Sequence, residues 1–312
     1  TPTVSGTTFA NIGSFVYQAG AGNTTVATAT TYNTLRGSNS TPVRLGGATT
    51  ATDVHLDSSN VSLTTMGNNL TTKTINNAGT LTLSADTTLT FSDLSGCGFG
   101  SSAGTLVSSG TADDPNTIRS SAGGGSPSEP TNKWDMQTPM TITADYTTFD
   151  YYVSFECDGG TININNCTLQ NVQNGQKGFC IKTACTLGSF NNNTINTTIS
   201  GGGSTALKTE SKAHATFNNL TITGTWGNEV YAEHAKLEFI NSNFDITNSS
   251  STSSGHIVSK AHNDTANLIE IVAGSGGLTY STIANPVDIP TGVVRQRTGL
   301  LTLNQDNKEF DS

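Results

Sequence analysis

Short runs in which apolar and polar residues alternate recur through the second half of the chain. Five of them place mostly apolar or small residues at every second position: Val153–Cys157, Ile181–Cys185, Leu207–Ser211, Val230–His234 and Ile257–Ala261. The positions between carry mostly polar or charged side chains, which is the period-two pattern of a half-buried β-strand. Because no single run can bury its apolar side alone, we expect the strands to stack, one per coil of a repeating structure.

A second pattern, Asn-x-x-apolar, advances in step with the first. It occurs in four segments about 24–27 residues apart, a period typical of solenoids, which begin at Asn166, Asn192, Asn219 and Asn243. We interpret these asparagines as superposed at a bend, where each amide points inward and hydrogen-bonds to the coils above and below. The alternative is that a chain rich in asparagine shows this spacing by chance. The fourth segment needs a one-residue bulge near Ile240 to stay in phase.

Together the two patterns predict an all-β fold, a single-stranded parallel β-helix that spans residues 45–285. Residues 45–95 contain short alternating strands separated by turn residues, which we interpret as earlier coils with shorter sides. Residues 1–44 are irregular and rich in Thr, Ser and Gly, and we expect them to cap one end or to contact another subunit. Residues 286–312 are expected to form short C-terminal strands and a tail.

Composition supports a solenoid rather than a compact globule. Of the 312 residues, 33% are hydrophobic and only 12% are charged, and 33 are glycine. A solenoid manages with few large aliphatic residues because its core is a narrow column and main-chain hydrogen bonds join its coils. Disorder is the competing explanation for such polarity, but the regular strands and the low charge argue against it.

The Asn-x-x-apolar coils, together with Gly110-Thr-Ala-Asp-Asp-Pro115 leading into Thr117-Ile118, resemble right-handed parallel β-helix repeat proteins of microbial cell surfaces. The resemblance covers about residues 80–270 and implies a right-handed coil. Such proteins include polysaccharide lyases, phage tailspike enzymes, adhesins and extracellular structural subunits. The fold alone therefore does not select a function.

Charge and hydropathy restrict the classes of partner and the cellular location that the sequence allows. The net charge is −9 and the few Lys and Arg are dispersed, which disfavours nucleic acid and anionic membranes as partners. The chain has no stretch of about 18 apolar residues that would span a membrane, and we expect a secreted protein of the cell surface. Asn-x-Ser/Thr sequons are as frequent as chance predicts for this composition, and the best placed to carry glycan are Asn196, Asn248 and Asn263.

Five cysteines suggest covalent links between coils. Cys157 and Cys185 would occupy one inward column of neighbouring coils, about 4.8 Å apart, which is within disulfide range. A pair of buried free thiols is the alternative. Cys167 and Cys180 flank a loop that a second disulfide would close. Cys97 is left over, and either a free thiol or an intermolecular bond would account for it.

The outward positions of the alternating runs carry the best candidates for catalysis, Lys182, Lys208, Glu210 and Glu233. The lyases of the resembled group hold Ca²⁺ with clustered carboxylates beside a basic residue, and no matching Asp cluster lies in these runs. Opposite charges one coil apart would instead pair with one another. Isolated acids such as Asp150 could ligate Ca²⁺, but the spacings match no zinc motif and indicate no other metal or cofactor.

The sequence therefore favours a non-enzymatic structural or adhesive protein. The ends of a β-helix expose unpaired strand edges, so copies of the chain could join end to end into a filament or sheath. Cell-surface glycans are a second class of partner. A polysaccharide lyase or hydrolase, which would use the outer face of the coils, and a glycan-binding module remain open as alternatives.

Overall fold

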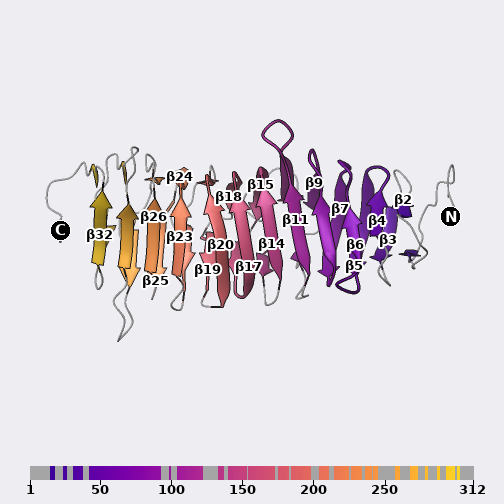
Figure 1. Ribbon diagram of the computed structural model, residues 1–312, viewed down its shortest axis with the longest axis horizontal. Helices are drawn as coiled ribbons and strands as arrows, with labels where there is room; N and C mark the ends of the chain where they lie inside the picture. Colours follow the sequence, from indigo (N-terminus) through magenta and orange to yellow (C-terminus); the bar gives the residue numbers. More distant parts are fainter. Residues whose placement is uncertain are drawn as a thin grey trace.

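The computed structural model describes the backbone of residues 15–17, 24–26, 31–37, 42–92, 98–99, 104–121, 133–136, 140–152, 154–172, 175–182, 184–197, 204–210, 214–224, 226–233, 236–240, 242–244, 257–260, 268–272, 278–279, 287–288, 293–298 and 301–302, and most side chains of these ranges between residues 31 and 242. The elements within these ranges are β-strands. They stack in parallel along one long axis, from β2 near one end to β32 near the other (Figure 1).

The strands form three sheets that run along this axis. Sheet A contains, in order, β1 (Phe15–Tyr17), β3 (Thr31–Gly37), β5 (Thr49–Leu56), β7 (Leu70–Asn77), β9 (Thr88–Phe91), β12 (Asn116–Ser120), β15 (Thr147–Tyr152), β18 (Thr168–Val172), β21 (Thr194–Thr197), β24 (Thr221–Gly224) and β27 (Asn243–Phe244), with β10 (Gly98–Phe99) beside β7. Sheet B contains β2 (Thr24–Val26), β4 (Pro42–Leu45), β6 (Ser62–Thr64), β8 (Thr80–Leu83), β11 (Thr105–Ser109), β14 (Thr141–Asp145), β17 (Gly160–Asn165), β20 (Cys185–Asn191), β23 (His214–Asn218), β26 (Lys236–Ile240), β29 (Leu268–Val272) and β32 (Val293–Thr298). Sheet C contains β13 (Lys133–Met136), β16 (Ser154–Cys157), β19 (Lys177–Ile181), β22 (Thr205–Thr209), β25 (Asn228–Glu233), β28 (Ile257–Lys260) and β31 (Val287–Asp288). A separate pair joins β30 (Leu278–Thr279) to β33 (Leu301–Thr302).

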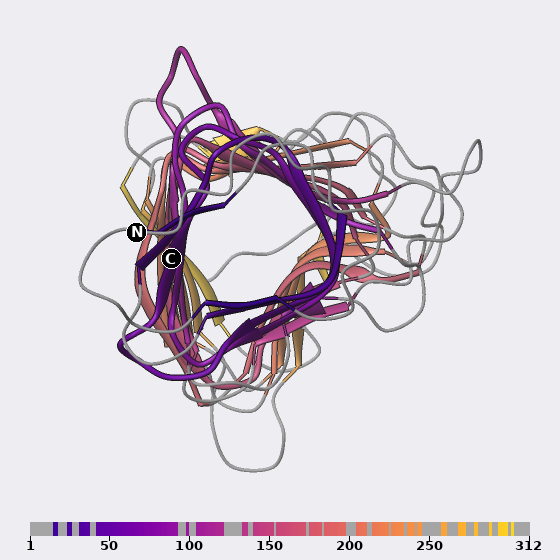
Figure 2. The same cartoon turned by 90° about the vertical axis from the view of Figure 1, so that its right-hand side faces the viewer.

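From β14 to β28 the chain passes through sheets B, A and C in turn, and neighbouring strands within each sheet come from successive coils. Viewed down the axis, the strands superpose on the sides of a coil (Figure 2). This is the parallel β-helix that the alternating runs predict. Because each strand bonds to the coils before and after it, the main chain itself holds the stack together.

The third side of the helix begins as the second half of long strands. β5 and β7 have eight residues each. In the next coil, β9 pairs with the first half of β7, at Leu70–Thr72, and β10 pairs with Thr74 and Ile75 in its second half. A long strand such as β7 therefore forms two sides of its coil. The two sides belong to separate sheets from the coil in which β13 lies next to β10.

The interior is a column of apolar side chains. Six buried phenylalanines form a continuous row along the axis, with neighbouring ring centroids 5.1–5.4 Å apart: Phe149, Phe155, Phe179, Phe190, Phe217 and Phe239. The centroid spacing matches the separation at which aromatic rings attract one another. A chain with 33% hydrophobic residues can thus fill a core, because each coil needs only a few large side chains.

Polar side chains line the inside of the corner between sheets B and A. The buried Asn116 accepts a hydrogen bond from the backbone N–H of Thr87 in the preceding coil, and the buried Asn193 accepts one from the N–H of Cys167. Both amide groups also donate to backbone carbonyls of the preceding coil. The side chains therefore satisfy backbone groups at the bend, where regular strand pairing is interrupted.

The β-helix extends beyond the predicted range 45–285. Within residues 1–44, strands β1 to β4 already belong to sheets A and B, and within residues 286–312, β31 and β32 extend sheets C and B. In the described part of the chain, further coils therefore stand where an irregular N-terminal cap was expected. Polar Thr-rich segments can join the stack because main-chain bonding does not depend on the side chains.

The register of sheet C differs from the predicted one in its earlier coils. Leu207 and Val230 align as predicted. However, Leu207 faces Phe179 rather than Ile181, a shift of two residues, and Ile181 faces Cys157 rather than Val153, a shift of four. Shifts by an even number of residues keep each side chain on its predicted face because the strand period is two.

Candidate functional site

A ladder of asparagine amides follows the outside of the corner between sheets B and A. Asn192 Nδ2 donates to Asn166 Oδ1 at 3.0 Å, and Asn219 Nδ2 donates to Asn192 Oδ1 at 2.7 Å. Asn166 in turn donates to Asp145 Oδ1 at 2.7 Å. The three asparagines have φ of 54, 56 and 52°, a left-handed conformation that asparagine adopts more readily than most residues. The bend therefore tolerates asparagine well, and the ladder requires it.

The predicted inward orientation of these asparagines is wrong. Asn192 and Asn219 are exposed, and Asn166 is half-buried. The inward position at this corner belongs to the next residue along the chain, as Asn193 shows with only 1% of its surface exposed. The two neighbouring positions face opposite ways because the left-handed residue turns the chain.

The fourth predicted member, Asn243, does not belong to the ladder. It faces Thr221, whereas a ladder member would face Asn219. The repeat from Thr221 to Asn243 is shorter than the repeat from Thr194 to Thr221 that comes directly before it, so the motif is displaced along the strand. A second ladder, which the sequence pattern did not single out, lies one position earlier and joins Asn165, Asn191 and Asn218.

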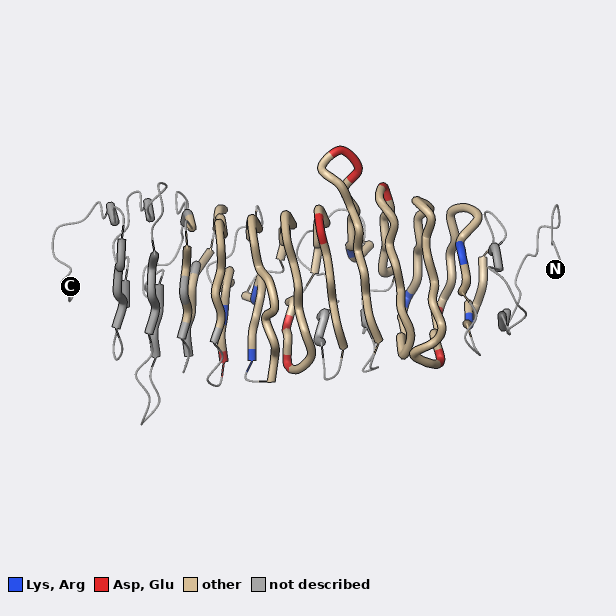
Figure 3. Tube along the Cα trace, in the orientation of Figure 1, with Lys and Arg blue, Asp and Glu red and all other residues tan. Residues whose placement is uncertain are grey.

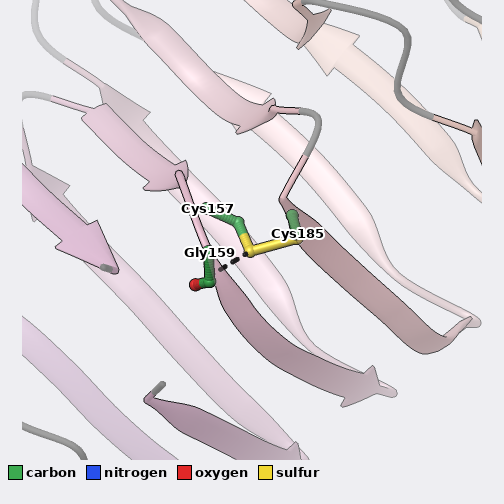
Figure 4. The surroundings of a disulfide bond; sticks show 3 residues. All are labelled: Cys157, Gly159 and Cys185. Atoms are coloured by element: carbon green, nitrogen blue, oxygen red, sulfur yellow. Dashed lines mark hydrogen bonds between the residues drawn. A yellow bond between two sulfur atoms is a disulfide. The ribbon is translucent and has the colours of Figure 1, made fainter. Parts of the chain in front are cut away.

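Cys157 and Cys185 form a disulfide with their Cα atoms 5.5 Å apart. The pairing is the predicted one, but its geometry differs. Cys157 ends β16 in sheet C and Cys185 begins β20 in sheet B, so the bond crosses the corner between two sides, close to Gly159 (Figure 4). It therefore fastens one side of a coil to the adjoining side of the next coil.

The predicted bond between Cys167 and Cys180 is absent, since both are free and buried. Cys167 lies at the corner between sheets B and A, where its Sγ donates to the carbonyl of Asn165 at 3.0 Å, and Cys180 lies in β19 of sheet C. Different sides of the coil hold the two thiols apart. Burial raises the pKa of each to about 12, so both are protonated and unreactive at neutral pH. Cys97 lies outside the described residues.

Sheet C carries the largest group of ion pairs within the described residues. We call it the sheet C cluster, and its members are Glu156, Asp158, Lys177, Lys182, Lys208 and Glu210. Lys177 Nζ lies 3.4 Å from Glu156 and 3.0 Å from Glu210. Lys182 Nζ lies 3.3 Å from Glu156 and 3.2 Å from Asp158. Lys208 Nζ lies 2.6 Å from Glu210, and it also lies 5.3 Å from the centre of the Tyr231 ring.

The protonation of the cluster follows from its contacts. Burial lowers the pKa of Lys177, but the Cys180 sulfur, Glu210 and Glu156 outweigh burial and raise it. Burial also lowers the pKa of Lys182, and its carboxylate partners again raise it. Burial raises the pKa of Glu210, but Lys208 and Lys177 outweigh burial, so the pKa lies below its ordinary value. These lysines therefore stay charged at neutral pH, and Glu210 stays ionised.

Such a cluster is poorly suited to proton transfer. A general base needs a pKa near the working pH and a free lone pair, whereas the pKa values of Lys177 and Lys182 are shifted away from neutrality. Glu156, whose side chain is only 6% exposed, contacts two lysines and also accepts a hydrogen bond from Ser154. The arrangement can bind neighbouring coils of sheet C together and cancel its own charge.

The structure brings together three of the four predicted catalytic candidates. Lys182, Lys208 and Glu210 share the sheet C cluster, and the side chain of Glu233 lies outside the described residues. The prediction missed Lys177, the residue that joins two carboxylates. Lys177 begins β19 at a position that alternation assigns to the inside, so no period-two signal could place it in this cluster.

The remaining polar candidates either contact other residues of the described structure or lie outside it. Asp150 accepts hydrogen bonds from Gln170 and Asn171. No three His, Cys, Asp or Glu side chains of the described ranges lie together in a way that could hold a metal ion. Asn196 is half-buried on β21, and its glycosylation stays a prediction. Asn248 and Asn263 lie outside the described residues.

Two further findings complete the description of the chain. None of the elements described is a helix with the length and apolar character needed to cross a membrane. Comparison of the chain with protein-family models, with curated proteins and with solved structures finds no match.

Proposed function

We propose that the chain is a non-enzymatic structural or adhesive protein that acts outside the cell as a rigid rod. The observation that carries the proposal is the sheet C cluster, because the side chains best suited to catalysis pair with one another. The Cys157–Cys185 bond supports an extracellular setting, since disulfides persist mainly in oxidising compartments. Continuous parallel sheets give the rod its stiffness.

End-to-end assembly is the proposed route to a filament or sheath. Among the described strands, β2 and β32 each have a neighbour in sheet B on one side only. The other edge of such a strand presents backbone N–H and C=O groups that can pair with another chain. Pairing of β32 in one copy with β2 in the next would continue sheet B without a break. An adhesive role would add cell-surface glycans as partners.

Light scattering and negative-stain electron microscopy of the purified protein test this function. We expect the mean mass to rise with concentration, and we expect rods longer than one chain. A strictly monomeric species at all concentrations would contradict assembly. A screen of acidic and neutral polysaccharides tests the enzyme alternative, and cleavage that is lost in both Lys208→Ala and Glu210→Gln would overturn the non-enzymatic proposal.

A further inference from the structure

The outer face of sheet B carries two columns of small uncharged side chains, most of them threonine. They come from five successive strands, β6, β8, β11, β14 and β17, and face away from the buried leucine, isoleucine and alanine positions between them. The first column is Ser62, Thr80, Thr105, Thr141 and Thr161. The second column is Thr64, Thr82, Val107, Thr143 and Asn163. We call the two columns the hydroxyl grid.

The grid is free of charge and its threonine hydroxyls are available. The only charged residue of these five strands is Asp145, which lies beyond the grid at the end of β14. Figure 3 shows that charged residues are sparse along the described part of the chain. Within the described structure, the threonine hydroxyls of the grid have no protein hydrogen-bond partner. The asparagine ladders at the neighbouring corner differ in this respect, because their amides bond to one another. The threonine hydroxyls of the grid can therefore donate and accept hydrogen bonds with solvent or with a ligand on the outer face.

The spacing of the grid is regular in two directions. Successive strands of a sheet lie about 4.8 Å apart, and side chains two residues apart along a strand lie about 6.6 Å apart. Hydroxyls at these separations cannot bond directly, since an O–H···O bond spans about 2.7–2.8 Å, so each must bond to water. The ladders that flank sheet B favour a flat sheet, because side-chain ladders oppose twist. Figure 1 shows the sheet B strands side by side along the axis.

These observations point to one occupant. The spacing across the strands is close to an oxygen repeat on the prism faces of hexagonal ice, the spacing along the strands is somewhat shorter than the second repeat of those faces, and the threonine methyl groups can fill the hollows between the bound oxygens. We propose that the hydroxyl grid of sheet B is an ice-binding surface. An uncharged lattice of hydroxyls and methyls suits a neutral, regular ligand, whereas protein interfaces are enriched in aromatic side chains and arginine at their centre, which the grid lacks.

Sheet A provides an internal comparison. It also has an outward column of threonines, which includes Thr148 and Thr168. Its second column contains Arg119 and Asp150, which face each other in neighbouring coils. These charges and their hydration interrupt the two-dimensional pattern. Ice binding is therefore assigned to sheet B alone, and it does not depend on whether the rods assemble end to end.

Partition of the protein into slowly growing ice, together with thermal hysteresis, tests the proposal. The wild-type protein should enter the ice and shape the crystals. Thr143→Lys, at the exposed centre of the grid, should lower partition several-fold, whereas the matched change Thr168→Lys on sheet A should leave it unchanged. Circular dichroism melting checks that both variants are folded.

Several outcomes would overturn the proposal. The first is exclusion of the wild-type protein from ice, and the second is an equal loss in the two folded variants. A dimer that Thr143→Lys dissociates, in protein that ice excludes, would assign the grid to a second copy of the chain. Retention on insoluble cellulose or chitin without partition into ice would assign it to a polysaccharide. Monomeric rods that partition into ice would contradict the assembly proposal alone.

Discussion

Individual residues at the corner between sheets B and A meet two demands at once. Asn192 adopts a left-handed backbone conformation, and its amide bonds to the coil on either side. Other residues in the left-handed conformation are Met66, Asp86 and Tyr146, so the bend itself does not require asparagine. The amide ladder is what the bend gains when asparagine occupies successive coils.

Substitution of Asn192 should separate these two contributions. Asn192→Ala is expected to lower the free energy of unfolding by about 2 kcal/mol, because it removes the ladder bonds and places alanine in a left-handed conformation. Asn192→Gly removes the same bonds without the conformational cost, and its loss should be smaller. Urea unfolding of both variants measures the difference. Equal losses would show that the backbone conformation contributes nothing.

At the scale of elements, the disulfide joins strands that no hydrogen-bonded register brings together. Cys157 closes β16 and Cys185 opens β20, and the bond spans 28 residues of sequence. Within each sheet the coils are already linked by main-chain pairing, whereas adjoining sides are linked by their turns and by core contacts such as that of Phe179 with Phe190. The covalent bond therefore strengthens the corner between sheets C and B.

Loss of this bond should destabilise the fold measurably. In the double variant Cys157→Ser with Cys185→Ser, the free energy of unfolding is expected to be about 3–4 kcal/mol lower than in the wild-type protein. The reason is that the unfolded chain gains entropy when a loop of this size is no longer closed. Chemical denaturation with and without reductant provides the measurement and its control. Reduction of the wild-type protein should reproduce the loss, and reduction should leave the double variant unchanged. A reductant effect of similar size in the double variant would contradict the assignment.

The whole molecule is a stack in which each coil depends on its neighbours for its hydrogen bonds, its phenylalanine row and its corner side chains. Stability in such a stack is close to a sum over coils and the contacts between them. The sheet C cluster and the buried thiols make part of this sum dependent on pH. The three lysines and three carboxylates of the cluster come from three successive coils.

Stability should therefore fall at both ends of the pH range. The folded state lowers the pKa of Glu210, so its contribution is present above 4.5, the ordinary value, and is lost as pH falls through the folded pKa. The folded state raises the pKa of Cys167 and Cys180 from 9.0 to about 12, so stability declines as pH rises through that interval. Urea midpoints at constant ionic strength test both limbs. Glu210→Gln should make the acid limb shallower, and an unchanged acid limb would contradict the role given to Glu210.

The fold was predictable because its signals are local and repeated. Alternation shows which side chains of a strand face inward, and the recurrence of Asn166, Asn192 and Asn219 shows that coils of similar length superpose. The register was less accessible. Displacing Ile181 by two residues leaves its side chain on the same face, so alternation could not distinguish Phe179 from Ile181 as the partner of Leu207.

The sequence by itself determined the class of fold and placed Cys157 near Cys185 in neighbouring coils, because both depend on a pattern that the chain repeats. The structure decided that these two thiols form a disulfide. Only the tertiary structure decided that the asparagine ladder lies outside the corner, that Lys177 joins Glu156 to Glu210, and that the threonine columns form a grid. These features depend on where each corner turns the chain. A turn combines the dihedral angles of a few residues with contacts from distant coils, and no periodic signal in the sequence records that combination.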